Sequence, residues 1–192
     1  SEFEIPASAV IGALILVYAG GYFGSDRRLG RLLSTLLVFL GAMLGLVLAD
    51  DLITLFVYWE LTAVSSVFLI WARKTDRSVR SGFRYLVIHV LSGVLLLAGA
   101  LIRFHETGSL EFGLVGLAGL GGWLIFFSFG IKAAFPLLHN WLTDAYPEGT
   151  PTGTVFLSAF TTKVAVYALA MRFPGTELLI YIGAAMTAVP LF

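Results

Sequence analysis

The sequence predicts an all-α, polytopic membrane protein built as a bundle of about seven transmembrane helices. Hydrophobic residues make up 58% of the 192 residues and charged residues 12%, against about 45–50% and about 25% in an average soluble domain. The mean hydropathy of +0.92 agrees, since twelve acidic and twelve basic side chains cannot cover a soluble fold of this size. Long apolar runs recur without strand-like alternation, which favours helices over a closed barrel.

The composition excludes several classes of function. The formal net charge is zero and no basic stripe carries stacking aromatics, so we expect no nucleic-acid partner. The chain has no cysteine, which excludes disulfides, thiolate metal sites and iron–sulfur clusters. Its three histidines are too scattered to suggest a zinc site. We therefore expect no cofactor, no metal ion, and no redox or hydrolytic site in this chain.

We expect residues 1–192 to form a single transmembrane domain. The predicted fifth span is too long for one straight crossing and contains Gly130 and Pro136, so we expect it to be broken in the middle of the membrane. The chain starts without Met and stops at Phe192 inside an apolar run, which suggests a piece of a longer protein. The predicted spans are about 6–23, 32–49, 52–71, 85–102, 113–145, 152–171 and 177–192.

Charges between the spans predict the orientation, because cytoplasmic loops carry an excess of Lys and Arg. The connections 24–31 and 72–84 are strongly basic, whereas those after the second and fourth spans are mainly acidic. We therefore expect 24–31 and 72–84 to face the cytoplasm. Asp144 and Glu148, at the end of the fifth span, depart from this trend.

Three charged residues lie in the interior of the predicted spans, away from their ends. Glu60 is near the middle of the third, Lys132 beside the expected break in the fifth, and Lys163 near the middle of the sixth. A charge at the centre of a bilayer costs about 2.5–3.5 kcal/mol on insertion scales and commonly marks an ion or proton pathway.

Proton transfer is the function that fits these residues. Burial disfavours the charged form of a lysine or a glutamate, whereas a nearby opposite charge favours it. A Glu60–Lys132 pair can therefore release a proton when its partners separate and recapture one when they meet again. Water beside the broken helix would then connect Lys132 to Lys163. The polar residues expected to hold that water are His139, Ser65, Ser66, Thr161 and Thr162.

Structural interpretations compete with this one. Glu60 and Lys132 would also serve as a pair that fixes helix register, and His139 would also serve as an interface residue beside Trp141. His89 lies close to Arg84 and is interpreted as a satisfied polar residue near the headgroups. Asp50 and Asp51 are expected to cap the helix that follows them.

Three segments resemble the antiporter-like subunits that Mrp-type multisubunit sodium/proton antiporters share with respiratory complex I. Together they cover most of residues 30–172 in the family's order. They are 46–66, which contains FVYWELTAVSS, then 132–145, KAAFPLLHNWLTDA, and 158–167, SAFTTKVAVY.

The resemblance implies roles for the buried charges. Glu60 and Lys132 would form the input pair, and Lys163 would be the relay that continues the path. Thr143 stands where the family usually has proline, which we expect to loosen the end of the broken helix. Lys163 resembles the relay of the D-type Mrp subunits and of two antiporter-like subunits of complex I. The WELTAVSS stretch looks more like the Mrp branch, so the chain is similar to the A-type or D-type subunits of Mrp antiporters. Family members are longer and contain a second, inverted repeat of five helices, which this chain would lack.

The favoured function is a proton- or cation-translocating subunit of a multisubunit Na+/H+ antiporter, moving protons through Glu60, Lys132 and Lys163, with His139 as a further candidate. Its partners would be other membrane subunits, the lipid bilayer, H+ and, for the assembly, Na+. Its place would be the bacterial plasma membrane. The alternative is a non-redox, proton-pumping subunit of an NADH:quinone oxidoreductase or a related respiratory complex, and the third is a structural scaffold with incidental charges.

Overall fold

A computed structural model describes residues 28–188 continuously, together with residues 10, 13, 14, 17 and 21. The predicted first span, 6–23, falls largely outside the described residues, as do residues 189–192 of the last. Every regular element in the described part is a helix, and the residues Asp51 and Glu111 form one isolated β-bridge. The all-α prediction is confirmed.

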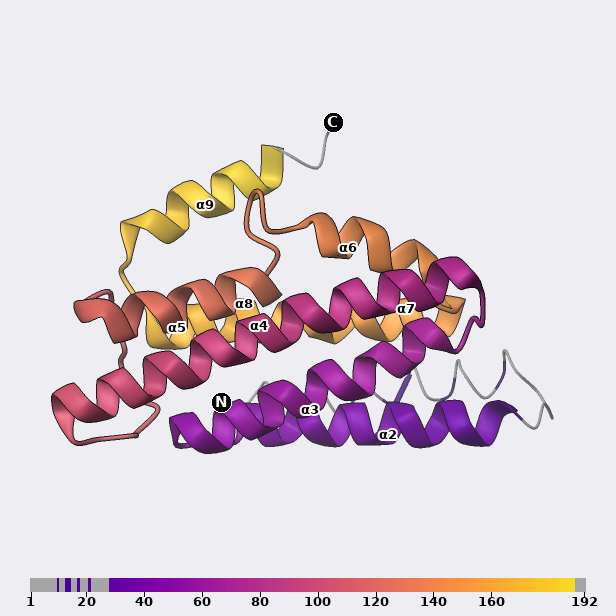
Figure 1. Ribbon diagram of the computed structural model, residues 1–192, viewed down its shortest axis with the longest axis horizontal. Helices are drawn as coiled ribbons and strands as arrows, with labels where there is room; N and C mark the ends of the chain where they lie inside the picture. The colour runs from indigo at the N-terminus through magenta and orange to yellow at the C-terminus, as the bar shows by residue number, and fades with distance from the viewer. Residues whose placement is uncertain (1–9, 11–12, 15–16, 18–20, 22–27, 189–192) are drawn as a thin grey trace.

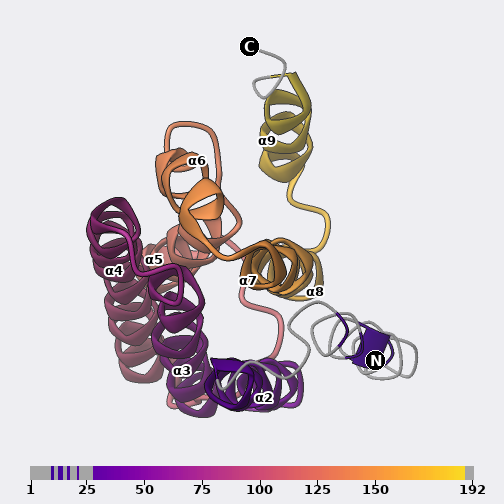
Figure 2. The same cartoon turned by 90° about the vertical axis from the view of Figure 1, so that its right-hand side faces the viewer.

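The helices form one bundle whose long axis runs along most of them (Figure 1). In the end-on view, α2, α3 and α4 form a curved row, and α7–α8 lie across the bundle from α4 (Figure 2). Helix α4 packs on both α3 and α5, α5 packs on α8, and α9 has no buried residue. The bounds are α2 Arg28–Val47, α3 Leu52–Trp71, α4 Asp76–Thr107, α5 Gly119–Lys132, α6 Asn140–Ala145, η1 Tyr146–Glu148, α7 Pro151–Phe156, η2 Leu157–Thr161, α8 Thr162–Arg172 and α9 Glu177–Ala188.

Four stretches are long and apolar enough to cross a membrane: Gly30–Val47, Leu52–Trp71, Asp76–Thr107 and Pro151–Arg172. Each is only partly buried within the bundle, and large apolar side chains such as Val87 and Leu91 face outward. Exposed apolar faces of this kind suit lipid rather than water. The chain is a multi-pass integral membrane protein.

Helix α4 is longer than the sequence predicted. The prediction placed a basic loop at 72–84 and a span at 85–102, but the helix already begins at Asp76 and continues to Thr107. Thr75 caps its first turn through a reciprocal hydrogen-bond pair with Ser78, and Gly108 ends it at a φ of 71°. The predicted bounds marked only the apolar part of the helix. Backbone hydrogen bonding continues the helix into the polar residues on either side.

The predicted fifth span, 113–145, is confirmed as broken but not in its bounds. Residues 109–118 form a connection, α5 begins at Gly119, and the break follows Lys132. The Phe135 amide donates to the Gly130 carbonyl oxygen at 2.9 Å, and a side chain on Gly130 would collide with the Phe135 ring. Ala134 has a φ of 62°, so the chain turns sharply away from the α5 axis, and Pro136 cannot resume the ladder.

A second irregularity interrupts the predicted sixth span. The five residues Leu157–Thr161 form a π-helical turn between α7 and α8. Single π-turns inserted in α-helices occur frequently at functional sites. Lys163 lies two residues after the end of this turn, in the first turn of α8.

Candidate functional site

Lys132 is buried at the centre of the candidate site. It is the last residue of α5, directly before the break, and is 1% exposed. Its Nζ donates to the carbonyl oxygen of Trp59 at 3.0 Å and to Oγ1 of Thr62 at 2.6 Å. The ammonium also lies 4.1 Å from the centroid of the Trp59 ring. Two oxygen acceptors and an aromatic face replace water around this charge.

Trp59 is held in place by a hydrogen-bonded chain that joins three helices. Its Nε1 donates to Oγ of Ser92 on α4 at 2.9 Å, and Ser92 donates to the carbonyl oxygen of Ser128 on α5 at 2.8 Å. The ring of Phe129 packs on the indole with centroids 5.0 Å apart. These contacts hold the indole ring in its orientation beneath the Lys132 ammonium.

Glu60 lies beside this cluster without being joined to Lys132. Its side chain interacts electrostatically with Lys132, but none of the ion pairs among the described residues joins the two. Its Oε1 is buried, has no hydrogen-bond partner, and occupies the space that a side chain on Gly93 of α4 would fill. The two predicted residues thus lie in one region of the bundle without forming an ion pair.

Lys163 lies outside this enclosure. It is exposed on α8, although the neighbouring Val164 and Ala165 are buried. It makes no hydrogen bond or ion pair with any described residue. The Lys132 ammonium is enclosed, whereas Lys163 is exposed. A water-filled connection between the two therefore stays a prediction.

The residues that were predicted to hold water differ in burial and in hydrogen-bond partners. Ser65 donates to the Leu61 carbonyl of its own helix at 2.6 Å, and Thr161 is buried with its hydroxyl unpartnered. Ser66 Oγ lies 2.7 Å from the Tyr85 hydroxyl of α4. His139 is half-buried at the start of α6. Helix α6 continues through Thr143, whose hydroxyl donates to the Asn140 carbonyl.

The interpretation of His89 as a satisfied headgroup residue is wrong. His89 is fully buried, and its Nε2 has no hydrogen-bond partner. Arg84 is a little more than one turn away along α4, but its side chain is exposed and pairs with Asp144. The predicted span began at residue 85 and so placed His89 near its end, whereas α4 begins at Asp76.

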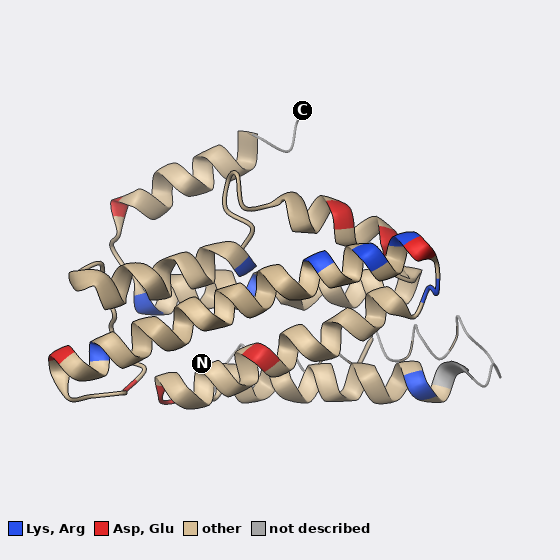
Figure 3. Ribbon diagram, in the orientation of Figure 1, with Lys and Arg blue, Asp and Glu red and all other residues tan. Residues whose placement is uncertain are grey.

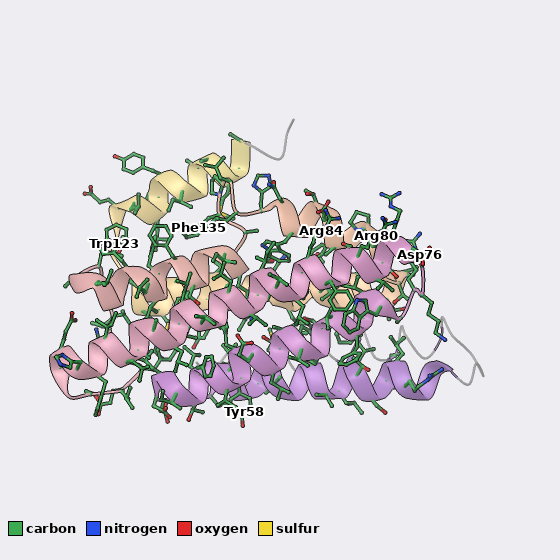
Figure 4. The ribbon with its side chains drawn as sticks, in the orientation of Figure 1. Tyr58, Asp76, Arg80, Arg84, Trp123 and Phe135 are labelled. Atoms are coloured by element: carbon green, nitrogen blue, oxygen red, sulfur yellow. The ribbon has the colours of Figure 1, made fainter. Side chains whose placement is uncertain are left out.

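The acidic residues that departed from the charge trend pair with the basic stretch of α4. Arg84 Nη1 lies 3.2 Å from Asp144 Oδ2, and Arg77 Nε lies 3.2 Å from Glu148 Oε1. Charged residues gather where α4 begins, next to α6 (Figure 3), and Arg80 and Arg84 extend along this edge (Figure 4). They line an open cavity of about 710 Å³. Asp144 and Glu148 neutralise part of the basic surface of α4. Their negative charge therefore does not contradict the predicted cytoplasmic position of residues 72–84.

Two features of the site were missed in the sequence. Thr62 lies three residues after Trp59, on the same face of α3, so this spacing alone would have indicated that the two residues are neighbours. The role of Gly93 depends on which side chain of α3 faces it, and no local signal marks that.

The sequence matches the family described as "NADH:quinone oxidoreductase/Mrp antiporter, TM" over residues 49–189. It is 33% identical over 177 residues to the Na(+)/H(+) antiporter A1 subunit of Staphylococcus aureus strain JH9, a match that covers 85% of this chain and 22% of the relative. The chain thus spans about a fifth of the length of the curated relatives it matches.

Solved structures share the fold. The Mrp complex from Dietzia sp. DQ12-45-1b matches with a TM-score of 0.73 and 22% identity, over 88% of this chain and 35% of that one. The membrane-bound sulfane sulfur reductase, an archaeal respiratory membrane complex, matches with a TM-score of 0.74 and 24% identity, over 91% and 41%. With most of the chain covered by the family match, this protein belongs to the NADH:quinone oxidoreductase/Mrp antiporter transmembrane family.

Proposed function

We propose that this chain is part of a proton- or cation-translocating subunit of a multisubunit Na+/H+ antiporter. Protons would move through Glu60, Lys132 and Lys163, with His139 at the start of α6 as a further candidate. Its partners would be other membrane subunits, and its place the bacterial plasma membrane, since the antiporter relative comes from a bacterium. The basic edge of α4 would face the cytoplasm.

The observation that carries this proposal is the environment of Lys132. An ammonium held by the Trp59 carbonyl and the Thr62 hydroxyl is stabilised while charged. The Glu60 carboxylate stands close enough to interact with it but is not bound to it. Moving that carboxylate towards or away from Lys132 changes the stability of the ammonium, which is the requirement for a proton switch.

The alternative is a proton-pumping subunit of a respiratory complex. The archaeal respiratory membrane complex supports it, since this chain shares its fold with a TM-score of 0.74. The antiporter is favoured because the relative with 33% identity is an antiporter subunit. Purifying the full-length protein with its native partners separates the two, because co-purifying redox subunits would support the pump.

Transport by the full-length protein assembled with its partner subunits tests the proposal. Everted membrane vesicles containing Lys132→Met should lose Na+-driven proton movement, followed with a pH-sensitive dye. Lys132→Arg should also lose it, because arginine keeps the charge but does not release its proton. Lys74→Met, at an exposed position between α3 and α4, is the matched control and should transport normally.

The Lys132→Arg variant distinguishes transport from a structural pair. A lysine that only fixes helix register would be replaced by arginine with transport retained. Normal assembly and normal exchange in both Lys132 variants would overturn the proposed function.

A further inference from the structure

His89 is a buried imidazole that neither the proposed relay nor the family resemblance uses. It lies on α4 with no exposed surface. Its Nδ1 is 2.9 Å from the Tyr85 carbonyl oxygen. A carbonyl oxygen only accepts hydrogen bonds, so Nδ1 carries the proton and Nε2 presents a lone pair. No described residue donates to that Nε2.

Two aromatic rings fix the orientation of this imidazole. The Tyr85 ring stacks on it with centroids 4.0 Å apart, and the Trp141 ring meets it edge-on at 4.5 Å. Trp141 in turn donates its Nε1 hydrogen to the Ile131 carbonyl at 2.9 Å. Ile131 directly precedes Lys132, so the ring that confines His89 is bonded to the end of α5 that carries the lysine.

The register between α3 and α4 places His89 level with the Lys132 binding site. Trp59 bonds to Ser92, and Ser66 bonds to Tyr85, so the two helices run antiparallel with these residues opposite one another. Thr62 lies three residues after Trp59, and His89 lies three residues before Ser92, which makes Thr62 and His89 opposite as well. Thr62 accepts the Lys132 hydrogen bond at 2.6 Å, and Lys132 interacts electrostatically with His89.

We propose that His89 is a second proton-binding site beside Lys132 and exchanges protons with it. The Nε2 lone pair accepts a proton from the Lys132 ammonium across one bridging water, which leaves a neutral amine and an imidazolium with a proton on each nitrogen. Return of the proton restores the starting pair. This inference rests on the proposed function, because it names a further residue of the same pathway.

The surroundings limit which other groups take part. The titratable groups around the imidazole are Tyr85 on its own helix, Lys132 of α5 and, further along α3, Glu60. The Asp144 carboxylate of α6 is turned to Arg84 at the surface. A buried acceptor without a donor is unfavourable, and a position used only for packing would avoid it with an apolar ring.

The test uses the full-length protein assembled with its partners in everted vesicles, with Na+-driven proton movement as the readout. His89→Gln fills similar space but binds no proton, and should lower the rate on the order of 100-fold while the subunits still co-purify. His105→Gln, at the exposed end of the same helix, is the matched control and should leave the rate unchanged.

Chemical rescue separates proton binding from packing. In His89→Ala vesicles, added imidazole should restore part of the rate, whereas pyrazole, with the same shape but far weaker basicity, should not. Equal rescue by both compounds, or a normal rate in His89→Gln, overturns the inference. Lys132→Met is measured alongside: if it transports normally the proposed function fails, whereas if it is inactive and His89→Gln is normal, only the inference about His89 fails.

Discussion

Lys132 and Lys163 lie on helices that pack against each other, α5 and α8, yet their surroundings are opposite. Lys132 is 1% exposed and bound by a carbonyl, a hydroxyl and an aromatic ring. Lys163 is exposed, with no bond to any described residue. Residues of α3 thus supply both hydrogen-bond acceptors of the Lys132 ammonium. Any partners of Lys163 must come from beyond the described residues, which fits a chain spanning about a fifth of its relatives' length.

The largest effect is expected from a substitution that tests the relay role of Lys163. In the full-length assembly, Lys163→Met should reduce Na+-driven proton movement by at least about 100-fold, since it removes a proton-transfer group. Dye-monitored vesicles measure the rate, and Lys74→Met serves as the control. A normal rate would mean that the exposed position is incidental and that the pathway does not include Lys163.

Thr62→Val tests how much the enclosure of Lys132 matters. The substitution preserves shape but removes the hydroxyl that accepts from Nζ at 2.6 Å. Hydrogen bonds to charged groups contribute about 1.5–3 kcal/mol, so we expect the exchange rate to fall by roughly 10- to 100-fold. Thr35→Val, whose hydroxyl donates only to the Arg31 carbonyl of its own helix, is the control, and equal rates in the two variants would contradict this account.

Gly93→Ala tests the position of Glu60. A methyl group at this position would occupy the space of the Glu60 carboxylate oxygen, so the carboxylate must move relative to Lys132. Overpacking in a tight core costs about 1–3 kcal/mol, and we expect a several-fold lower rate with intact assembly. Gly41→Ala on α2, where a side chain meets nothing within 4 Å, should transport normally.

The smallest effect is expected outside the membrane spans, at the cap of α3. Asp51 accepts from the backbone amides of Ile53 and Thr54 at 2.9 and 2.8 Å. Hydrogen bonds from Thr54, above all from its side chain, hold the pKa of this carboxyl below its ordinary value of 3.8. Asp51→Ala should cost about 1 kcal/mol of stability, measured as a lower thermal midpoint at neutral pH, with transport nearly unchanged.

The pH dependence of that loss follows from the sign of the shift. A carboxyl whose pKa is lowered by folding contributes stability that is fully present above its unfolded pKa and is lost as the pH falls through the folded one. The difference between wild type and Asp51→Ala should therefore shrink as the pH is lowered below 3.8. Asp50→Ala, which removes a neighbouring exposed carboxylate without removing the cap, is the control and should show no such loss.

Much of the architecture could be predicted because it depends on local chemistry. Composition and apolar run length determine that the chain is helical and membrane-embedded, since lipid offers the backbone no hydrogen bonds. Gly130 and Pro136 indicated the break after Lys132, and Asp51 indicated the start of α3, because each acts on its own few residues. Helix ends were predicted less well, as α4 shows, because polar residues permit a helix without requiring one.

What the sequence determined about function is the set of candidate charges, Glu60, Lys132 and Lys163, because an ionisable residue in an apolar span is visible without knowing its neighbours. Only the tertiary structure decided that Lys132 is enclosed and Lys163 open, and that Glu60 rests in the space left by Gly93. It also decided that His89 is buried within the bundle. The physical reason is that the burial of a side chain depends on the register between helices distant in sequence. The unfavourable burial of a charge can be recognised from the residues around it in the sequence, but the partner that offsets it cannot.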